Sequence, residues 1–253
     1  MRSFLNQKKP LLVSMVQAAS PDRTKELMRL SEKDGAEAFG MQFCKFKPEY
    51  RSKEIYRDLF GYAGDKPVYV TNYRGAYNKD KGDEVLADEL LELAGCGATL
   101  CDVMGDYFDI TEGELTMDPV AIEKQIALID GIHAKGAEVL MSSHVKKFIP
   151  AERVLEIALE HQRRGADISK IVTGAENMAE QIENLRIIDM IKQRLDIPFL
   201  FLAGGVSHIM RRIGGAIGSC MYLCVHEHDE LATSAQPLLS DVKQIRYFLE
   251  EKK

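Results

Sequence analysis

The chain has 253 residues, of which 45% are hydrophobic and 28% are charged, so it is long and apolar enough to bury a full globular core. Its 33 Lys and Arg against 39 Asp and Glu give a net charge of -6 without any Lys/Arg-rich block, which excludes nucleic acid as an expected partner. The five cysteines form no CxxC pair, and no run suits a signal peptide or a membrane span, so we expect a cytoplasmic protein without disulfides, structural zinc or membrane contact.

Short β-rich apolar runs alternate with longer stretches of helical periodicity along the chain. The eight runs predicted as strands are residues 10–16, 36–43, 67–73, 98–104, 137–144, 167–172, 197–203 and 219–225. The helical stretches between them include residues 83–94, 119–134, 151–163 and 175–194. Eight strands in 253 residues leave about 32 residues for each unit, and near-continuous apolar runs are typical of parallel strands buried on both faces. We therefore predict a single (β/α)8 TIM barrel that occupies residues 1–253.

Small-residue turns at the helix-to-strand junctions support this barrel. Gly35, Gly97, Gly136 and Gly165 each follow a predicted helix, where glycine adopts the left-handed conformation at little cost. An open, doubly wound α/β sheet is the alternative architecture. No GxGxxG motif follows the first predicted strand, which weakens that alternative.

Lys170 is the first candidate catalytic residue. In a TIM barrel the active site lies at the carboxyl ends of the strands, and Lys170 lies in the sixth apolar run on the same face as Ile168 and Val172. If this face is the barrel interior, burial favours a neutral amine that can attack a carbonyl carbon. The alternative is a structural lysine that pairs with a carboxylate such as Asp167 or Asp102.

His144 is the second candidate, because it ends the fifth predicted strand, one unit before Lys170. Neighbouring strands of a sheet are about 4.8 Å apart, so we expect the two side chains to lie side by side. A histidine beside an amine nucleophile can move the protons of imine formation and of α-proton abstraction. The alternative is a histidine that the adjacent Ser142 and Ser143 hold for structural reasons.

Five segments resemble motifs of one enzyme family, in that family's order. The segments are residues 70–74 (VTNYR), 139–144 (VLMSSH), 165–172 (GADISKIV), 210–219 (MRRIGGAIGS) and 233–235 (TSA). Together they resemble the type I 3-dehydroquinate dehydratases, in which the second segment carries the catalytic histidine and the third carries the Schiff-base lysine. The ordered set, rather than any single segment, carries the resemblance.

The resemblance implies a homodimeric (β/α)8 barrel of the shikimate pathway that converts 3-dehydroquinate to 3-dehydroshikimate and water, without a metal or an added cofactor. Lys170 would form an imine with the substrate ketone, and His144 would remove the adjacent proton and then protonate the departing hydroxyl. The resemblance further implies that Arg212 binds the substrate carboxylate, that Arg74 lies at the mouth of the site and that Ser234 lies on the loop that closes over the substrate.

The chain departs from the family pattern at several substrate-binding positions. Gln42 ends the second strand, where the family has a Glu-x-Arg pattern, and Asn78 is the ungapped match to a glutamate that helps to position the histidine. Met104 replaces another glutamate, and Gln236 lies close to the position of a closing-loop glutamine. A site that hydrogen-bonds particular hydroxyls discriminates strongly, so the changes indicate reduced activity on 3-dehydroquinate or activity on a related hydroxy-keto acid.

Two other functions stay open at this point. A class I aldolase of the same chemistry would hold a phosphate near Gly204, Gly205 and Ser207, a loop whose alternative interpretation is a tight turn. A catalytically silent, metabolite-binding barrel would explain the altered positions, but it would need neither the lysine nor the histidine. His208 either projects into the site or is solvated at a helix start, and the histidines of segment 226–228 are expected to be solvated rather than to bind a metal.

Overall fold

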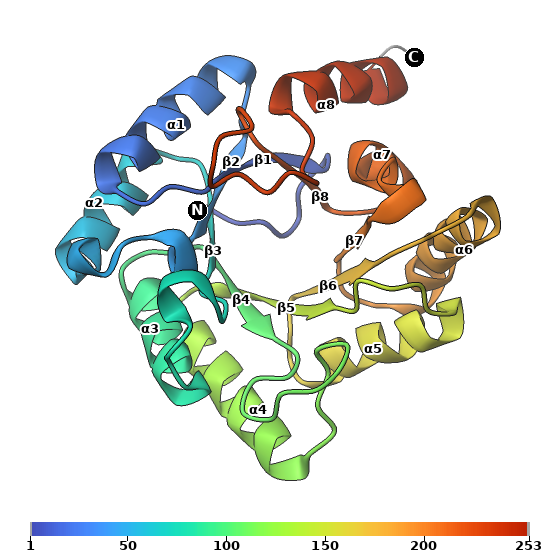
Figure 1. Ribbon diagram of the computed structural model, residues 1–253, viewed down its shortest axis with the longest axis horizontal. Coiled ribbons are helices and arrows are strands. Elements are labelled where there is room, and N and C mark those ends of the chain that lie inside the picture. Colours follow the sequence, from blue (N-terminus) through green and yellow to red (C-terminus); the bar gives the residue numbers. More distant parts are fainter. Residues whose placement is uncertain (1, 252–253) are drawn as a thin grey trace.

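The structure, a computed structural model, describes residues 2–251 and the side chains of residues 2–249. Eight parallel strands form a nearly closed barrel inside a ring of helices (Figure 1), so the predicted (β/α)8 TIM barrel is confirmed. The strands are β1 (Leu11–Val16), β2 (Ala38–Gln42), β3 (Val68–Thr71), β4 (Leu100–Met104), β5 (Glu138–His144), β6 (Ile168–Thr173), β7 (Phe199–Ala203) and β8 (Met221–Cys224). Each lies within its predicted run, except that β6 extends one residue beyond it.

The strands pair in the order in which they follow one another in the chain. Their sequence around the barrel is β7-β6-β5-β4-β3-β2-β1-β8, and a backbone hydrogen bond from Cys220 to Phe199 crosses from the start of β8 to β7 over 2.8 Å. The register of β5 and β6 places Ser142 opposite Lys170, two residues before His144. The carboxyl ends of β5 and β6 therefore bring the lysine and the histidine to the same end of the barrel.

In the described part of the chain, eight α-helices surround the strands. They are α1 (Pro21–Asp34), α2 (Lys53–Tyr62), α3 (Asp83–Gly95), α4 (Pro119–His133), α5 (Ala151–Arg163), α6 (Met178–Arg194), α7 (Met210–Ile217) and α8 (Leu239–Arg246). Helices α1, α2, α4 and α6 each begin directly after a residue whose side chain caps the helix. Helix α6 begins three residues later than predicted, because the Asn177 side chain accepts the backbone N–H of Glu180 and caps the helix there. Gly35 ends α1 with a φ of 100°, as predicted. No helix within residues 2–251 is long and apolar enough to cross a membrane.

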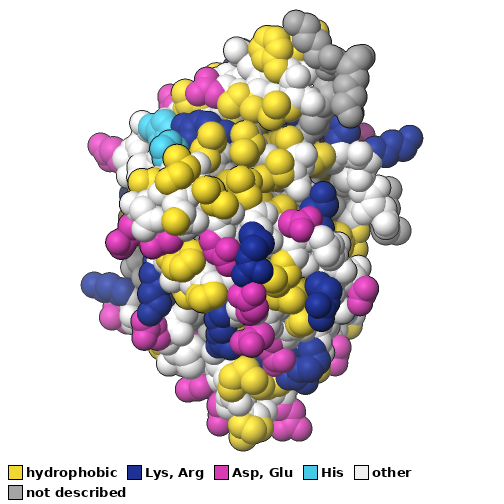
Figure 2. Space-filling view, turned by 90° about the vertical axis from the view of Figure 1, so that its right-hand side faces the viewer, with side chains coloured by type: hydrophobic (Ala, Val, Ile, Leu, Met, Phe, Trp, Pro, Cys, Tyr) yellow, Lys and Arg dark blue, Asp and Glu magenta, His cyan; other side chains and the backbone are white. Residues whose placement is uncertain are grey.

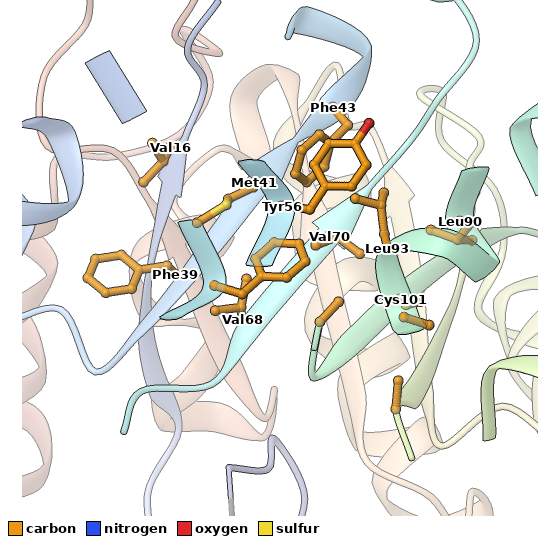
Figure 3. Close-up of a cluster of buried hydrophobic side chains, with 14 of the residues drawn as sticks. Val16, Phe39, Met41, Phe43, Tyr56, Val68, Val70, Leu90, Leu93 and Cys101 are labelled. Carbon is orange, nitrogen blue, oxygen red and sulfur yellow. The ribbon is translucent and has the colours of Figure 1, made fainter. Parts of the chain in front are cut away.

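The larger part of the apolar core lies between the strands and the surrounding helices. Figure 3 shows the part of this outer core around β2 and β3, where Phe39 and Val68 face the helices. Phe43, directly after β2, packs edge-to-face on Tyr56 of α2, with 5.1 Å between the ring centroids. Such aromatic pairs contribute about 0.5–1.5 kcal/mol beyond the area that they bury. The outer core thus fixes the strands against α2 and orients the residues that follow β2.

The barrel interior holds a second apolar cluster, built from alternate residues of the strands. Its members include Val13, Ala38, Leu100, Leu140, Ile168, Leu200, Met221 and Leu223. Phe4, from the segment before β1, belongs to this cluster and packs against Tyr69 with a centroid distance of 6.4 Å. The backbone N–H of Phe4 donates to Glu138 at the start of β5 over 2.8 Å. The amino end of the barrel is therefore filled by the N-terminal segment.

Candidate active site

A cavity of about 130 Å³ lies at the carboxyl ends of the barrel strands. It is lined by Met15, Gln17, Gln42, Tyr69, Thr71, Tyr73, His144, Lys170, Val172, Leu202, Arg211, Leu223, Thr233 and Gln236. Seven of the eight strands or the residues directly after them contribute to this wall, together with α7 and the loop after β8. Lys170 and His144 thus face the same cavity, and the strand face that carries Ile168, Lys170 and Val172 is the one that points into the barrel.

Lys170 lies at the centre of a hydrogen-bonded network, with its side chain only 5% exposed. Its Nζ lies 2.6 Å from Tyr73 Oη, 3.2 Å from Tyr69 Oη and 3.1 Å from Asp102 Oδ2. Each of the three protons of a lysine ammonium therefore has an acceptor. Of the two carboxylates considered as partners of Lys170, Asp102 forms the ion pair, whereas Asp167 accepts a backbone N–H of β5 over 2.7 Å.

Asp102 on β4 is fully buried and accepts several hydrogen bonds. Its Oδ2 accepts the hydroxyls of Tyr69 and Tyr73, and its Oδ1 accepts a serine hydroxyl of β5 over 2.5 Å. Burial alone raises the pKa of Asp102, but the charges of Lys170 and His144 and the hydrogen bonds outweigh burial, so this pKa is lowered. Burial, together with the Asp102 charge, raises the pKa of both tyrosines. The network therefore combines an ion pair with two protonated phenols.

His144 forms a pair with Glu114, which comes from the loop between β4 and α4. Its Nδ1 lies 2.6 Å from Glu114 Oε2, and its backbone N–H donates to the same oxygen over 3.0 Å. Burial raises the pKa of Glu114, but the hydrogen bond from His144 and its charge outweigh burial and lower this pKa. Because the carboxylate can only accept, it holds a proton on Nδ1 and leaves Nε2 to exchange a proton with a ligand.

The loop that carries Glu114 is anchored at several points. Glu114 has a φ of 52°, a left-handed conformation that a non-glycine residue adopts only where its surroundings enforce it. Its carbonyl accepts the Ser143 hydroxyl over 2.6 Å and lies so close to Gly105 that a Cβ there would be 2.5 Å away. The buried Arg164 donates to the carbonyls of Gly105 and Thr116 at the two ends of the loop. Ser143 therefore supports Glu114, which in turn holds His144.

Two buried side-chain atoms within residues 2–249 have no hydrogen-bond partner, namely Thr71 Oγ1 and Arg211 Nε. Both residues line the cavity. Burial lowers the pKa of the Arg211 guanidinium, and no neighbouring carboxylate offsets this effect. An unsatisfied buried polar group costs about 1–3 kcal/mol, so it is expected where a ligand completes the hydrogen bonds. The cavity therefore presents a cation and a hydroxyl to a ligand, beside Lys170.

Gln42 and Gln236 are predicted site residues that do line the cavity. Gln17 Nε2 donates to Gln236 Oε1 over 3.2 Å and to Thr233 Oγ1 over 3.0 Å. Lys45 in turn donates to Gln17 Oε1 over 3.0 Å. These hydrogen bonds hold the loop after β8 over the ends of β1 and β2. The side-chain amides of Gln17, Gln42 and Gln236 thereby complete the cavity wall.

Arg212 and Ser234 are predicted site residues that do not belong to the cavity wall. Arg211 lines the cavity in place of Arg212, because neighbouring residues of a helix point about 100° apart. Ser234 is exposed, whereas its neighbour Thr233 faces the cavity. In both cases the residue that lines the cavity is the one directly before the residue chosen from the sequence.

Arg74 and Asn78 are occupied by contacts within the fold and also lie outside the cavity wall. Arg74 forms ion pairs with Asp83 over 2.6 Å and with Asp106 over 2.8 Å. Asn78 is only 1% exposed, and its Oδ1 accepts a hydrogen bond from Arg51 over 2.6 Å. Both residues therefore stabilise the segment after β3 rather than face a ligand.

The other sequence candidates are accounted for by packing or by exposure. Met104 lies in the outer core. Gly205 has a φ of 64°, and a Cβ there would lie 2.2 Å from Ala175 O, so this loop is a tight turn. Ser207 is buried and accepts a side-chain hydrogen bond from α6, and His208 is exposed. Among the residues that the structure describes, no group of three or more His, Cys, Asp or Glu side chains could hold a metal ion.

Several polar residues of the site were not predicted from the sequence, among them three residues of one strand face, an arginine of α7 and Glu114. Tyr69, Thr71 and Tyr73 follow one another at every second position, which is the period of one strand face, so this signal could have identified them. Arg211 is adjacent to the residue that was chosen. Glu114 has no comparable local signal, because it reaches His144 from a loop 30 residues earlier in the chain.

The fold and the cavity define an enzyme-type (β/α)8 barrel, in which an ion-paired lysine, a carboxylate-paired histidine and an unpartnered arginine surround one cavity at the carboxyl ends of the strands. The sequence model of the type I 3-dehydroquinase family matches residues 51–253. The chain belongs to this family, which confirms the resemblance of its motifs. Comparison with curated proteins gives no match.

Several solved structures are similar over almost the whole chain. The 3-dehydroquinate dehydratase from Geobacillus kaustophilus HTA426 has a TM-score of 0.84 at 16% identity, covering 100% of this chain and 97% of that one. The type I enzyme from Clostridium difficile, with covalently modified comenic acid, has a TM-score of 0.80 at 16% identity, covering 98% and 95%. The enzyme from Enterococcus faecalis has a TM-score of 0.74 at 17% identity, covering 100% and 99%. At these identities the likeness shows the fold alone.

Proposed function

We propose that the protein is a carbon–oxygen lyase that dehydrates 3-dehydroquinate, or a related hydroxy-keto acid, through an imine on Lys170. The observation that carries this proposal is that Lys170, His144 and the two unpartnered atoms of Thr71 and Arg211 all belong to one small cavity. The product of 3-dehydroquinate would be 3-dehydroshikimate, with water as the second product. The family of the chain supports this reaction class. A cytoplasmic location and a role in the shikimate pathway stay predictions.

In the proposed mechanism, the imine acts as an electron sink that acidifies the neighbouring C–H bond. The Asp102 carboxylate, which pairs with the Lys170 ammonium, would pair equally with the iminium cation, because the positive charge stays on the same nitrogen. His144 Nε2 would remove the neighbouring proton and then return a proton to the departing hydroxyl, so that water leaves. Glu114 stabilises the imidazolium that forms between these two steps.

Arg211, rather than Arg212, is the residue that we expect to bind the substrate carboxylate. We predict that Arg211→Ala raises KM about 10- to 100-fold, since a hydrogen bond to a charged group contributes about 1.5–3 kcal/mol. Arg212→Ala is the matched control, because it removes the same charge one position away from the cavity wall. Steady-state kinetics of both variants provide the measurement. Equal KM values for Arg211→Ala and wild type would remove Arg211 from the site.

The two alternative functions have less support in the structure. A phosphate-binding aldolase would need an open cradle around Gly205 and Ser207, but this turn is tight and Ser207 is already hydrogen-bonded to α6. A silent binding barrel would not need the pair of Glu114 and His144 beside a buried lysine. The neutral amides of Gln42 and its neighbours suit a hydroxylated ligand.

Borohydride trapping tests the proposed function directly. The protein is mixed with 3-dehydroquinate and reduced with borohydride, and intact mass and peptide mapping are measured. We expect a stable adduct on Lys170. A folded protein without an adduct, beside an authentic type I dehydratase trapped in parallel, would mean that the likeness extends to the fold but not to this substrate.

We also propose that the protein is a homodimer. Met178, Ile182 and Leu185 form one exposed apolar face of α6, and Val206 and Ile209 add to it before α7. Figure 2, which looks at this side of the molecule, shows apolar side chains gathered on the surface. An apolar patch of this kind is typical of an interface with another protein.

Light scattering after size exclusion tests the dimer. We predict twice the 28.4 kDa mass of the chain for wild type and a monomer for Ile182→Glu. Val85→Glu, at a 48% exposed position of α3, is the control that adds the same charge elsewhere. A monomeric wild-type protein at micromolar concentration would contradict the proposal.

A further inference from the structure

Tyr73 lies between the cavity and the buried carboxylate of Asp102. Asp102 is 0% exposed and does not line the cavity, whereas Tyr69, Tyr73 and Lys170 do. The hydroxyls of both tyrosines donate to Asp102 Oδ2. Any proton that passes between a ligand and Asp102 must therefore travel through Lys170 or through one of the two phenols.

The direction of these hydrogen bonds is fixed by the number of protons available. Each phenol has one proton, and burial raises the pKa of Tyr69 and Tyr73 well above the ordinary value, so both keep it. A phenol that donates to Asp102 can only accept from Lys170. The resting network thus runs from the Lys170 ammonium through the tyrosine oxygens to the carboxylate, and every donor in it has an acceptor.

Imine formation makes a particular demand on this network. A ketone and a lysine ammonium give an iminium and water, so two protons leave the lysine nitrogen and reach the departing oxygen. A group near that nitrogen has to hold each proton and return it. Asp102 can hold a proton, but it cannot touch a substrate oxygen in the cavity.

We propose that Tyr73 is a catalytic residue that relays the protons of imine formation between Asp102 and the substrate carbonyl oxygen. This inference rests on the proposed imine on Lys170. It goes beyond the elimination step, in which His144 acts, because it concerns how the imine is made and hydrolysed.

The proposed relay conserves every proton. Lys170 passes one proton to Asp102, and the neutral amine forms the N–C bond while the carbonyl oxygen receives a proton from Tyr73, which regains one from Asp102. The nitrogen then passes a second proton to Asp102, and the C–O bond breaks as Tyr73 delivers that proton to the leaving hydroxyl. Water departs, Asp102 and Tyr73 end in their starting forms, and the iminium keeps one proton and the positive charge.

Tyr73 is better placed for this role than Tyr69 or His144. Its oxygen lies 2.6 Å from Lys170 Nζ, against 3.2 Å for Tyr69, and it is partly exposed whereas Tyr69 is fully buried. The His144 ring meets the Tyr73 ring edge-on, 5.3 Å between centroids, and its Nδ1 is occupied by Glu114. Tyr73 thus separates the proton transfers at the lysine from those at the histidine.

The test is the rate of borohydride-trappable adduct formation with 3-dehydroquinate, measured for wild type and Tyr73→Phe by rapid quench and intact mass. We expect the forward rate and the rate of imine hydrolysis to fall together, each about 10²-fold, with the final adduct fraction unchanged. A catalytic group speeds imine formation and imine hydrolysis by the same factor, so its loss leaves the equilibrium fraction of adduct unchanged. A hydroxyl that only stabilised the free lysine would instead change that equilibrium fraction. Tyr107→Phe, a buried tyrosine outside the cavity wall, is the matched control and should keep wild-type rates.

Replacement of Tyr73 by 3-fluorotyrosine provides a second variant that retains the hydroxyl and the shape of the ring. Because fluorine lowers the phenol pKa, we expect the alkaline limb of the adduct-formation rate to move to lower pH. Wild-type rates for Tyr73→Phe, or a changed adduct fraction without slower rates, would overturn the relay. Absence of any adduct in the wild-type protein would instead overturn the proposed function, so the two failures are distinguishable.

Discussion

Lys170→Met is expected to abolish both the borohydride adduct and dehydration, with a loss in kcat of about 10⁵-fold or more. Without the amine no imine forms, so the substrate C–H bond loses its electron sink, and removal of a covalent nucleophile has effects of this order. The measurements are intact mass after reduction and kcat with 3-dehydroquinate. Lys79→Met, which removes an exposed lysine from the loop after β3, is the control and should remain active.

The same substitution should also lower stability, because it leaves the Asp102 carboxylate buried without its partner. Loss of one member of a buried ion pair costs about 3–5 kcal/mol. In the variant, Asp102 stays buried without the lysine charge, which raises its pKa above the value in the unfolded chain. Folding then favours the protonated carboxyl, so the loss in free energy of unfolding relative to wild type should become smaller as the pH falls. Adding Asp102→Asn should recover most of the stability while activity stays lost. Residual turnover in Lys170→Met with an unchanged rate would refute the imine.

Glu114→Gln is expected to lower kcat about 10²-fold with little change in KM. The amide oxygen can still accept the hydrogen bonds from His144, but the negative charge that stabilises the imidazolium during proton transfer is lost. For the same reason the acid limb of the kcat profile should move to lower pH. A full pH profile of kcat and KM provides the measurement.

Glu112→Gln is the matched control for this prediction. Glu112 lies in the same loop, where it is exposed and paired with Lys147. It should retain the wild-type profile, which separates the charge at Glu114 from a general effect on the loop. If Glu114→Gln lowers kcat at every pH without shifting the pH dependence, the carboxylate would only support the backbone of the loop.

Asn78, which the motif resemblance matches to a glutamate, is hydrogen-bonded to Arg51, Asn72 and Tyr73 rather than to His144. Asn78 turns inward to Arg51, so the segment after β3 provides no carboxylate to the histidine. Glu114 provides one from the next loop, between β4 and α4. In this chain the carboxylate partner of His144 therefore comes from the loop between β4 and α4 and not from the segment after β3.

The sequence by itself determined the barrel and its two central residues. Apolar runs of strand length, helical periodicity and glycine at the helix ends are local signals, and local backbone preferences place the predicted elements within about three residues of their observed bounds. Lys170 and His144 followed from the same pattern, because a closed parallel barrel brings the carboxyl ends of all its strands together. Tyr69, Thr71 and Tyr73 could have been predicted in the same way, because alternate residues of a strand lie on one face.

Only the tertiary structure decided what surrounds those two residues. Arg211 faces the cavity and Arg212 does not, because the phase of the short helix α7 is set by its packing on β7 and β8 rather than by its own sequence. Glu114 reaches His144 through a left-handed backbone conformation that Arg164 and Ser143 enforce from distant elements. Such positions depend on contacts between residues far apart in the chain, and a local pattern cannot encode them.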